Sequence, residues 1–330
     1  GVRADVITYN TLVSAAGRAA QWPAAVRLAQ RMAAEGIPPD VVTYNALIAA
    51  AQRAGEPEEA FDVLDRMRGA QVAPNGVTYS SLVAAASVRG QWQRAAAVVR
   101  EMREAGHPPG TVAYTALIAA CGRAGRCDEA LQALEEMRAE RVRPNAATFS
   151  AVLSACARRG RWEEALQALR IMDEEKVAPN ERTLSAAVAA CGNAGEAEEA
   201  RRVFTELRGR GVRPNMMGYN ALISAHAAAG QVAEAFAAAA QAEAEGLEWD
   251  LVTGNALIAA CARARQWERA FAVFRDMVEE RGLHPDTVTY NALISACEKG
   301  GRWREALAAL EHMRRSGVPP DTITFNALIS

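Results

Sequence analysis

A unit of 35 residues repeats through the whole chain and constrains the fold more than any other feature. Its opening segment reads VVTYNALIAA at Val41. Related segments begin at Val6, Gly76, Thr111, Ala146, Glu181, Met216, Leu251, Thr287 and Thr322. The spacing is 35 residues throughout, except for 36 residues between Leu251 and Thr287. Repeats of this kind are typical of solenoids, in which each repeat packs on its neighbours.

The period divides the chain into nine full repeats with a partial repeat at each end. The full repeats are residues 6–40, 41–75, 76–110, 111–145, 146–180, 181–215, 216–250, 251–286 and 287–321. Residues 1–5 close an earlier repeat, and residues 322–330 begin another. Because no span is left for a second domain, we predict one array over residues 1–330.

Each repeat has the pattern of two short helices. In repeat 41–75 we expect the first helix from about Val42 to Arg53, followed by a turn at residues 54–57. The second helix carries apolar residues at helical spacing from Ala60 to Met67, and Pro74 prevents it from continuing. Helices this short are unstable alone, so stacking must stabilise them. We therefore predict an all-α, right-handed superhelical α-solenoid of helix-turn-helix repeats.

Two positions of the second helix indicate close packing. Position 20 of the repeat is alanine in all nine full repeats, and so small a side chain allows neighbouring helices to approach closely. Position 17, where the second helix begins, is often tryptophan. We interpret these tryptophans as packing anchors rather than as base-stacking platforms: Trp22, Trp92, Trp162, Trp267 and Trp303.

The sequence shows no catalytic or metal-binding pattern. Five of the six cysteines share repeat position 11: Cys121, Cys156, Cys191, Cys261 and Cys297. Stacked helices lie about 8–10 Å apart, so these thiols are too far apart to share a metal ion or a disulfide, and we expect them in the core. The four histidines have no ligand spacing and no nucleophile partner. We predict no enzyme activity, cofactor, metal ion or small-molecule substrate.

Composition narrows the class of protein further. Apolar residues make up 50% of the chain, which excludes intrinsic disorder. No run of 18 apolar residues occurs, so we expect no membrane span. The net charge of −2 argues against nonspecific electrostatic binding to nucleic acid, although separated charged faces would allow specific binding.

The chain resembles the pentatricopeptide repeat family along its whole length. The resemblance is carried by the VVTYNALI opening, the Ala-Gly turn, the EEA-F/L-x-x-L-x-x-M second helix and the closing proline followed by Asp or Asn. The uniform 35-residue units are similar to those of the P class of the family. The resemblance implies a protein that holds single-stranded RNA, one base per repeat.

The family reads bases with repeat positions 5 and 35, which the resemblance places in the concave groove. The corresponding pairs are Asn10/Asp40, Asn45/Asn75, Ser80/Gly110, Thr115/Asn145, Ser150/Asn180, Ser185/Asn215, Asn220/Asp250, Asn255/Asp286 and Asn291/Asp321, and Asn326 begins a tenth. Aspartate occurs only opposite asparagine, and serine or threonine is never paired with aspartate. Such correlated choices favour a code in which positions 5 and 35 together select one base. A turn or a helix cap would explain the residues at either position taken alone, but not their correlation.

Family rules give this chain a predicted target. Asn with Asp implies U, Asn with Asn implies C, and Ser or Thr with Asn implies A. An asparagine carboxamide can pair with the edge of a pyrimidine, and a shorter hydroxyl side chain leaves room for a purine. Read parallel to the chain, the expected site is 5′-U-C-R-A-A-A-U-U-U-Y-3′. The third base is weakly defined because Gly110 supplies no side chain.

Two further positions are implied as RNA contacts. Position 2 sandwiches the bases in the family, and its apolar occupants here are Ile7, Val42, Val77, Val112, Met217, Val252, Val288 and Ile323; Ala147 and Arg182 depart from this pattern. Position 13 is basic in six full repeats, and these residues could contact phosphates: Arg18, Arg53, Arg123, Arg158, Arg263 and Lys299. The alternative is that they are solvated side chains near a helix C-terminus.

The resemblance implies that the chain stabilises, processes or aids translation of an organellar transcript, with the chloroplast favoured over the mitochondrion. Because the sequence opens inside a repeat, we expect any targeting segment to lie outside it. The expected partner is single-stranded RNA, together with other RNA-processing, ribosomal or transcription proteins. Two alternatives are a protein-binding α-solenoid associated with a ribosome or polymerase, and the RNA-targeting arm of a longer enzyme.

Overall fold

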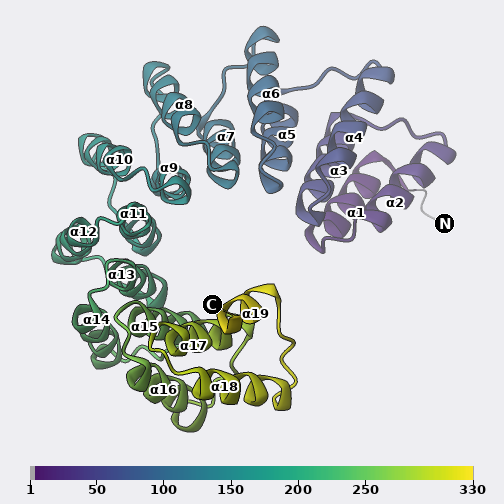
Figure 1. Cartoon of the computed structure of the whole chain (residues 1–330). Helices are drawn as coiled ribbons and strands as arrows, with labels where there is room; N and C mark the ends of the chain where they lie inside the picture. Colours follow the sequence, from purple (N-terminus) through teal and green to yellow (C-terminus); the bar gives the residue numbers. More distant parts are fainter. Residues whose placement is uncertain (1–3, 330) are drawn as a thin grey trace. The chain divides into compact units, whose positions relative to one another are not determined.

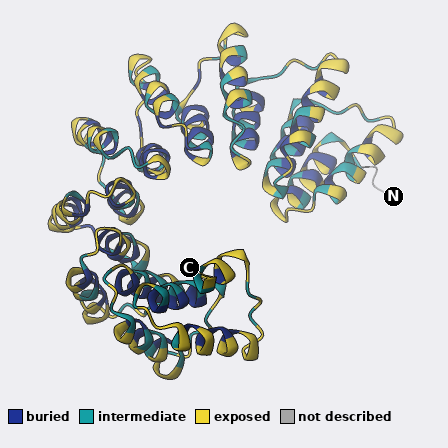
Figure 2. Ribbon diagram, viewed as in Figure 1, coloured by how far each residue is buried: buried dark blue, intermediate teal, exposed yellow. Residues whose placement is uncertain are grey.

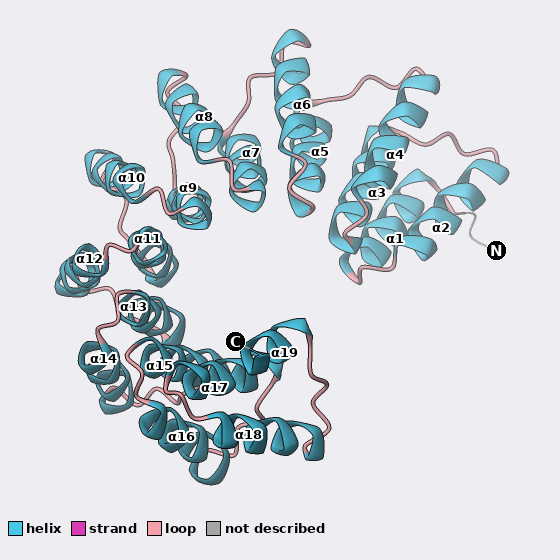
Figure 3. Ribbon diagram, in the orientation of Figure 1, coloured by secondary structure: helices cyan, strands magenta, loops and turns pink. Residues whose placement is uncertain are grey.

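The computed structural model describes residues 4–329, and these residues form nineteen α-helices, one π-helical turn and no β-strand (Figure 3). The predicted all-α fold is therefore confirmed. By its contacts the chain divides into two compact units. The N-terminal unit comprises residues 1–156 and 167–177, and the C-terminal unit comprises residues 157–166 and 178–330.

The helices follow the repeat closely. The N-terminal unit contains α1 (Val6–Arg18), α2 (Trp22–Ala34), α3 (Val41–Ala54), α4 (Pro57–Gly69), α5 (Gly76–Val88), α6 (Trp92–Glu104), α7 (Thr111–Ala124) and α8 (Cys127–Ala139). Two helices contribute residues to both units, α9 (Ala146–Arg159) and α10 (Trp162–Glu174). The C-terminal unit contains α11 (Glu181–Ala194), α12 (Ala197–Gly209), α13 (Met216–Ala228), α14 (Val232–Ala244), α15 (Leu251–Arg263), α16 (Trp267–Arg275), η1 (Asp276–Glu280), α17 (Thr287–Lys299), α18 (Trp303–Arg315) and α19 (Thr322–Ile329).

Within each unit the packing is the same from one repeat to the next (Figure 1). The odd-numbered helices are the first helices of the repeats, and consecutive ones lie side by side. In the N-terminal unit α2, α4 and α6, and in the C-terminal unit α12, α14, α16 and α18, pack on the first helix of their own repeat and on that of the following repeat. Equivalent residues of consecutive first helices therefore come close together, which is the arrangement a repeated binding site requires.

Repeat 41–75 shows why the chain turns where it does. Helix α3 ends at Ala54 and is capped by Gly55, whose φ of 78° is left-handed and favours glycine. The expected turn at 54–57 was too long by two residues, because Ala54 is the last residue of α3 and Pro57 is the first residue of α4. Proline is well tolerated there, since the N–H that it lacks would have no partner within the helix.

The core lies between the helices, on the sides that face neighbouring helices (Figure 2). The alanines of repeat position 20 are buried in all nine full repeats, as predicted. The six cysteines are also buried, and burial raises the pKa of Cys121 to about 12. The tryptophans of position 17 are less buried than expected, and Trp303 is 64% exposed. Trp92, for example, stacks beneath Arg126 of the next repeat.

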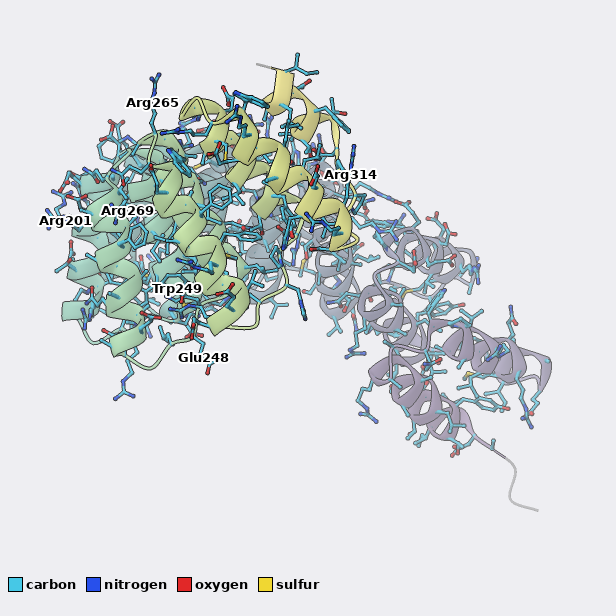
Figure 4. All side chains as sticks on the ribbon, turned by 60° about the horizontal axis from the view of Figure 1, so that its bottom comes forward. Arg201, Glu248, Trp249, Arg265, Arg269 and Arg314 are labelled. Atoms are coloured by element: carbon cyan, nitrogen blue, oxygen red, sulfur yellow. The ribbon has the colours of Figure 1, made fainter. Side chains whose placement is uncertain are left out.

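The single 36-residue repeat absorbs its extra residue in the π-helical turn η1. The loop before this repeat is also unusual, because Trp249 stands where the other full repeats have proline. Trp249 lies beside Glu248 in that loop (Figure 4). The guanidinium of Arg281 lies 3.8 Å above the tryptophan ring, and Arg281 also pairs with Glu243 and Asp276. These contacts connect the end of η1 to the preceding repeat.

Candidate nucleic-acid interface

Repeat position 35 is the N-cap of the next first helix. The Oδ1 atom of Asp40 accepts the backbone N–H of Thr43 at 2.8 Å, and that of Asn75 accepts the N–H of Thr78 at 3.0 Å. Asp250 and Asp286 cap α15 and α17 in the same way. Asp and Asn are preferred at this position because their oxygens satisfy an N–H that the helix leaves unpaired. Helix capping is therefore one role of these residues.

The same side chains also contact position 5 of their own repeat where that position is asparagine. The Nδ2 group of Asn10 donates to Oδ1 of Asp40 at 3.1 Å. The corresponding distances are 3.3 Å for Asn45/Asn75, 3.0 Å for Asn220/Asp250, 3.4 Å for Asn255/Asp286 and 3.0 Å for Asn291/Asp321. The sequence correlation between asparagine and aspartate thus has a physical cause, because the amide can donate to the carboxylate. We call positions 5 and 35 of one repeat a reading pair.

The serine and threonine reading pairs are built differently. The hydroxyls of Ser80, Ser150 and Ser185 each donate to the carbonyl four residues earlier in their own helix, at 2.7–2.8 Å. Thr115 instead contacts the hydroxyl of Thr148 at 2.8 Å. Serine is too short to bridge to position 35, so these pairs leave more open space beside the helix.

The printed hydrogen bonds of Ser185 and Asn215 do not join the two side chains of this reading pair. The Oδ1 atom of Asn215 accepts the backbone N–H of Gly218 at 3.1 Å and so caps α13. The Ser185 hydroxyl donates to the carbonyl of Glu181 in α11 at 2.8 Å. The two side chains thus bond to different helices, because serine lacks the reach and the amide of asparagine. Asn215 is a helix cap in this structure, and base reading by it stays a prediction.

Sequence reasoning missed a third residue of the asparagine pairs. It is a buried threonine at position 3 of the following repeat, and in four of the five pairs it hydrogen-bonds to the asparagine. Thr78 Oγ1 lies 2.7 Å from Oδ1 of Asn45, and Thr253 Oγ1 lies 2.7 Å from Oδ1 of Asn220. The available signal was threonine at position 3 in eight of the ten copies of the opening segment.

Apolar side chains at position 2 are exposed beside the reading pairs. Their exposed fractions run from 54% for Val252 to 73% for Ile7. Positions 2 and 5 are three residues apart on a helix and so lie on the same side of it. A row of exposed aliphatic side chains next to polar ones is an expected binding surface, because burying the aliphatic groups on a ligand is favourable.

Hollows in this surface occur at reading pairs. One of about 770 Å³ is lined by Val77, Ser80, Gly110 and Val112, among other residues. Another of about 270 Å³ is lined by Asn220 and Val252, with small residues such as Ala221. The larger hollow lies where the reading pair has a serine and a glycine, so little side-chain volume fills it.

The basic residues of position 13 are exposed, and they have a structural role in at least two repeats. Arg123 donates to the carbonyl of Ser87 at 2.8 Å, and Arg263 donates to that of Ala227 at 2.8 Å. These side chains satisfy the last carbonyls of the preceding first helix. Phosphate contact by position 13 stays a prediction, and an arginine with one N–H engaged keeps others to offer.

Ion pairs between second helices neutralise many of the acidic residues. Arg103 lies 3.0 Å from both Glu136 and Glu140, and Arg138 lies 2.8 Å from Glu175. Such pairs between exposed groups stabilise little. Their effect on charge is larger, because these glutamates are paired with arginines within the protein.

Hydrogen bonds favour the ionised form of two reading-pair carboxylates, Asp40 and Asp286. Burial alone would raise the pKa of Asp40, but hydrogen bonds from Thr43 and Asn10 lower it below its usual value. The pKa of Asp286 is lowered in the same way by Thr289 and Asn255. At neutral pH these side chains are therefore hydrogen-bond acceptors only.

Within the described part of the chain, no group of three or more His, Cys, Asp or Glu residues is placed to hold a metal ion. None of the described helices is long and apolar enough to cross a membrane.

Family models match nearly the whole chain. The model described as the pentacotripeptide-repeat region of PRORP matches residues 9–170 and 162–250, and the PPR repeat family matches residues 249–299 and 285–330. The chain belongs to the pentatricopeptide repeat family. None of the curated proteins compared with it matches.

Solved structures of pentatricopeptide repeat proteins have the same fold. One is the protein PPR10 in complex with an 18-nt psaJ RNA element, at 25% identity and a TM-score of 0.67, with 98% of this chain and 52% of that chain covered. Another is PPR10 from maize, at 23% identity and a TM-score of 0.56, with 100% of this chain and 56% of that chain covered. This chain spans about half the length of these proteins.

Proposed function

We propose that this chain binds single-stranded RNA in a sequence-specific way, with one base per repeat. The observation that carries the proposal is the hydrogen-bonded reading pair. It recurs along the first helices, each time beside an exposed aliphatic side chain of position 2. The similar protein PPR10 is bound to RNA in its crystal structure, which supports the same ligand class here.

The reading pairs offer different groups to a base. Each asparagine of position 5 uses one N–H toward position 35, and in four of the five pairs its Oδ1 atom also accepts from a threonine of the next repeat. Its second N–H and one oxygen lone pair are left for a ligand. In Asn10/Asp40 the second carboxylate oxygen is an acceptor, which suits the N3–H donor of uracil. In Asn45/Asn75 an amide replaces that carboxylate and can donate, which suits the N3 acceptor of cytosine. This chemistry supports U at the first base and C at the second.

Serine and threonine pairs leave room for a larger base. In this proposal the pairs of repeats 111–145, 146–180 and 181–215 take adenine, and the open hollow at Ser80 and Gly110 takes a purine without reading its edge. The aliphatic side chains of position 2 lie between successive bases. The basic residues of position 13 attract the phosphates. The full site is then 5′-U-C-R-A-A-A-U-U-U-Y-3′.

The chain acts by occupying the strand and performs no chemistry on it. A bound array blocks exonucleases and prevents the covered segment from pairing. We propose that it stabilises, processes or aids translation of an organellar transcript, in a chloroplast rather than a mitochondrion.

Fluorescence anisotropy tests the proposal with three labelled RNAs. These are the predicted ten-base strand, a scrambled strand of equal composition and the predicted strand in a duplex. We expect the predicted single strand to bind most tightly, because pairing hides the base edges, and its affinity to fall with salt. Equal binding of the predicted and scrambled strands would contradict sequence-specific reading.

A further inference from the structure

A buried threonine fixes the asparagine of each well-formed asparagine reading pair. The distance from threonine Oγ1 to asparagine Oδ1 is 2.6 Å for Thr43 and Asn10, and 2.6 Å for Thr324 and Asn291. It is 2.7 Å for Thr253 and Asn220. In every case the threonine comes from position 3 of the repeat that follows the asparagine.

The direction of these hydrogen bonds is determined by the neighbouring groups. A carboxylate only accepts, so the Nδ2 group of Asn220 must face Asp250 and its Oδ1 atom must face Thr253. The Thr253 hydroxyl accepts the backbone N–H of Asp250 at 3.4 Å, and it has one proton to give. Its nearest acceptor is Asn220 Oδ1 at 2.7 Å, against 3.0 Å for Asp250 Oδ1. The amide is therefore held at both ends.

We infer that threonine at position 3 is a positioning residue for base reading, acting on the asparagine of the preceding repeat. The inference rests on the proposed RNA-reading function. An amide that is held at both ends cannot exchange its N–H and C=O ends, and so it presents its remaining donor and acceptor to a base in a single sense. The specificity of one repeat then depends on a residue of the next.

The distribution of threonine along the chain supports this role. Threonine follows every asparagine of the nine full repeats. The two copies without it have Ala113 and Gly218, and both follow a serine reading pair. Those serines, Ser80 and Ser185, donate to their own helix and need no outside partner. At Gly218 even a Cβ atom would lie 2.8 Å from the Leu184 side chain, so a threonine would not fit without a shift.

The 36-residue repeat shows what happens when the arrangement is disturbed. The Asn255/Asp286 hydrogen bond is the longest of its kind, at 3.4 Å. Thr289 donates to Asp286 at 2.8 Å, and the buried Oδ1 atom of Asn255 has no partner. This asparagine is held at one end only, so we expect weaker discrimination at the eighth base than at the seventh.

The test replaces the threonine hydroxyl and measures base preference in the full chain. Thr253→Val removes the hydroxyl at nearly constant volume, and Thr253→Ser keeps a hydroxyl. Anisotropy is measured with two ten-base RNAs that differ only in U or C at the seventh base. We expect the wild-type chain to prefer U. One net hydrogen bond corresponds to a factor of about five, so Thr253→Val should lower the U-over-C ratio by about fivefold, and Thr253→Ser should restore most of it.

Thr183→Val is the matched control. Thr183 accepts the backbone N–H of Asn180 at 2.7 Å, so this variant also loses a capping hydrogen bond, but the preceding reading pair has a serine. It should lower the melting temperature by a similar amount and leave the seventh-base ratio unchanged. If Thr253→Val prevents folding, Thr43→Val tests the same contact at the first base.

Three results would count against the inference. If the Thr253→Val chain folds and keeps the wild-type U-over-C ratio at the seventh base, the threonine acts only in helix capping. The same conclusion follows if Thr183→Val lowers that ratio as much as Thr253→Val does. If the wild-type chain itself shows no preference between U and C, the proposed function fails at this repeat and the inference fails with it. That outcome is seen before any substitution is made, so the two failures are distinguishable.

Discussion

The reading pair of repeat 111–145 offers a direct way to rewrite one base. Thr115 and Asn145 should read A at the fourth base. Replacing them by Thr115→Asn and Asn145→Asp gives the residues of Asn10/Asp40, which should read U. The structure shows that the rest of the arrangement is already present, because the Thr148 hydroxyl lies 2.8 Å from that of Thr115.

The expected magnitude follows from these contacts. The new asparagine would accept from Thr148 and donate to the new aspartate, as in the other asparagine pairs. Asn145 caps α9 by accepting the N–H of Thr148 at 2.9 Å, and aspartate caps as well as asparagine. Each change should therefore alter the free energy of unfolding by less than about 0.5 kcal/mol. One exchanged polar contact contributes about 1 kcal/mol, or about fivefold in relative affinity.

The assay measures both proteins against RNAs with A or U at the fourth base, and the comparison of ratios removes any general loss of affinity. The wild-type chain should prefer A and the double variant should prefer U. An unchanged preference in a folded double variant would refute the assignment of this pair to the fourth base, and with it the register of the whole array.

Three other predictions address the aliphatic row, the core and the reading carboxylates. Val252→Ser should weaken RNA binding by about 1 kcal/mol, since roughly 0.8 kcal/mol accompanies each buried methylene, and anisotropy should show this with no change in melting temperature. Gly254→Ala would place a Cβ atom against the Met277 side chain and should cost about 1–3 kcal/mol in urea unfolding. Because the pKa values of Asp40 and Asp286 are lowered in the folded chain, their ionisation stabilises the folded state. This contribution to the free energy of unfolding is complete above the unfolded pKa of about 3.9 and is lost as the pH falls through the folded pKa. U preference and melting temperature should thus be constant from about pH 8 to pH 5 and decline below about pH 4, whereas a loss of U preference between pH 8 and 6 would contradict ionised carboxylates.

Periodicity made the fold predictable from sequence. The 35-residue spacing and the apolar stripes define where each helix begins, and α3 and α4 lie within a residue or two of the expected positions. The correlation between Asn10 and Asp40, repeated in other copies, corresponds to a hydrogen bond between the two side chains, and base reading by them stays a prediction. Repeats make such inferences possible because one chain supplies many examples of each position.

Side-chain direction was not predictable in the same way. Thr43 and Thr253 look like ordinary members of a helix cap, and only the coordinates show that their hydroxyls reach an asparagine of the preceding repeat. The sequence also did not show that the Asn215 oxygen would cap the next helix without a hydrogen bond to Ser185. The sequence did not show that one N–H of Arg263 would donate to a carbonyl near the end of α13, and phosphate contact by this residue stays a prediction. The position of the extra residue of the 36-residue repeat was not predictable either, because a loop could have accommodated it as well as the π-helical turn at 276–280.

Selection from a random pool tests the central claim most directly. The full chain is incubated with ten-base single-stranded RNAs of random sequence, and the bound strands are sequenced. One-base-per-repeat reading predicts enrichment of U at bases 1, 7, 8 and 9, of C at base 2 and of A at bases 4 to 6, with the weakest selection at bases 3 and 10. Equal base frequencies at all ten positions would show that the chain does not read RNA sequence.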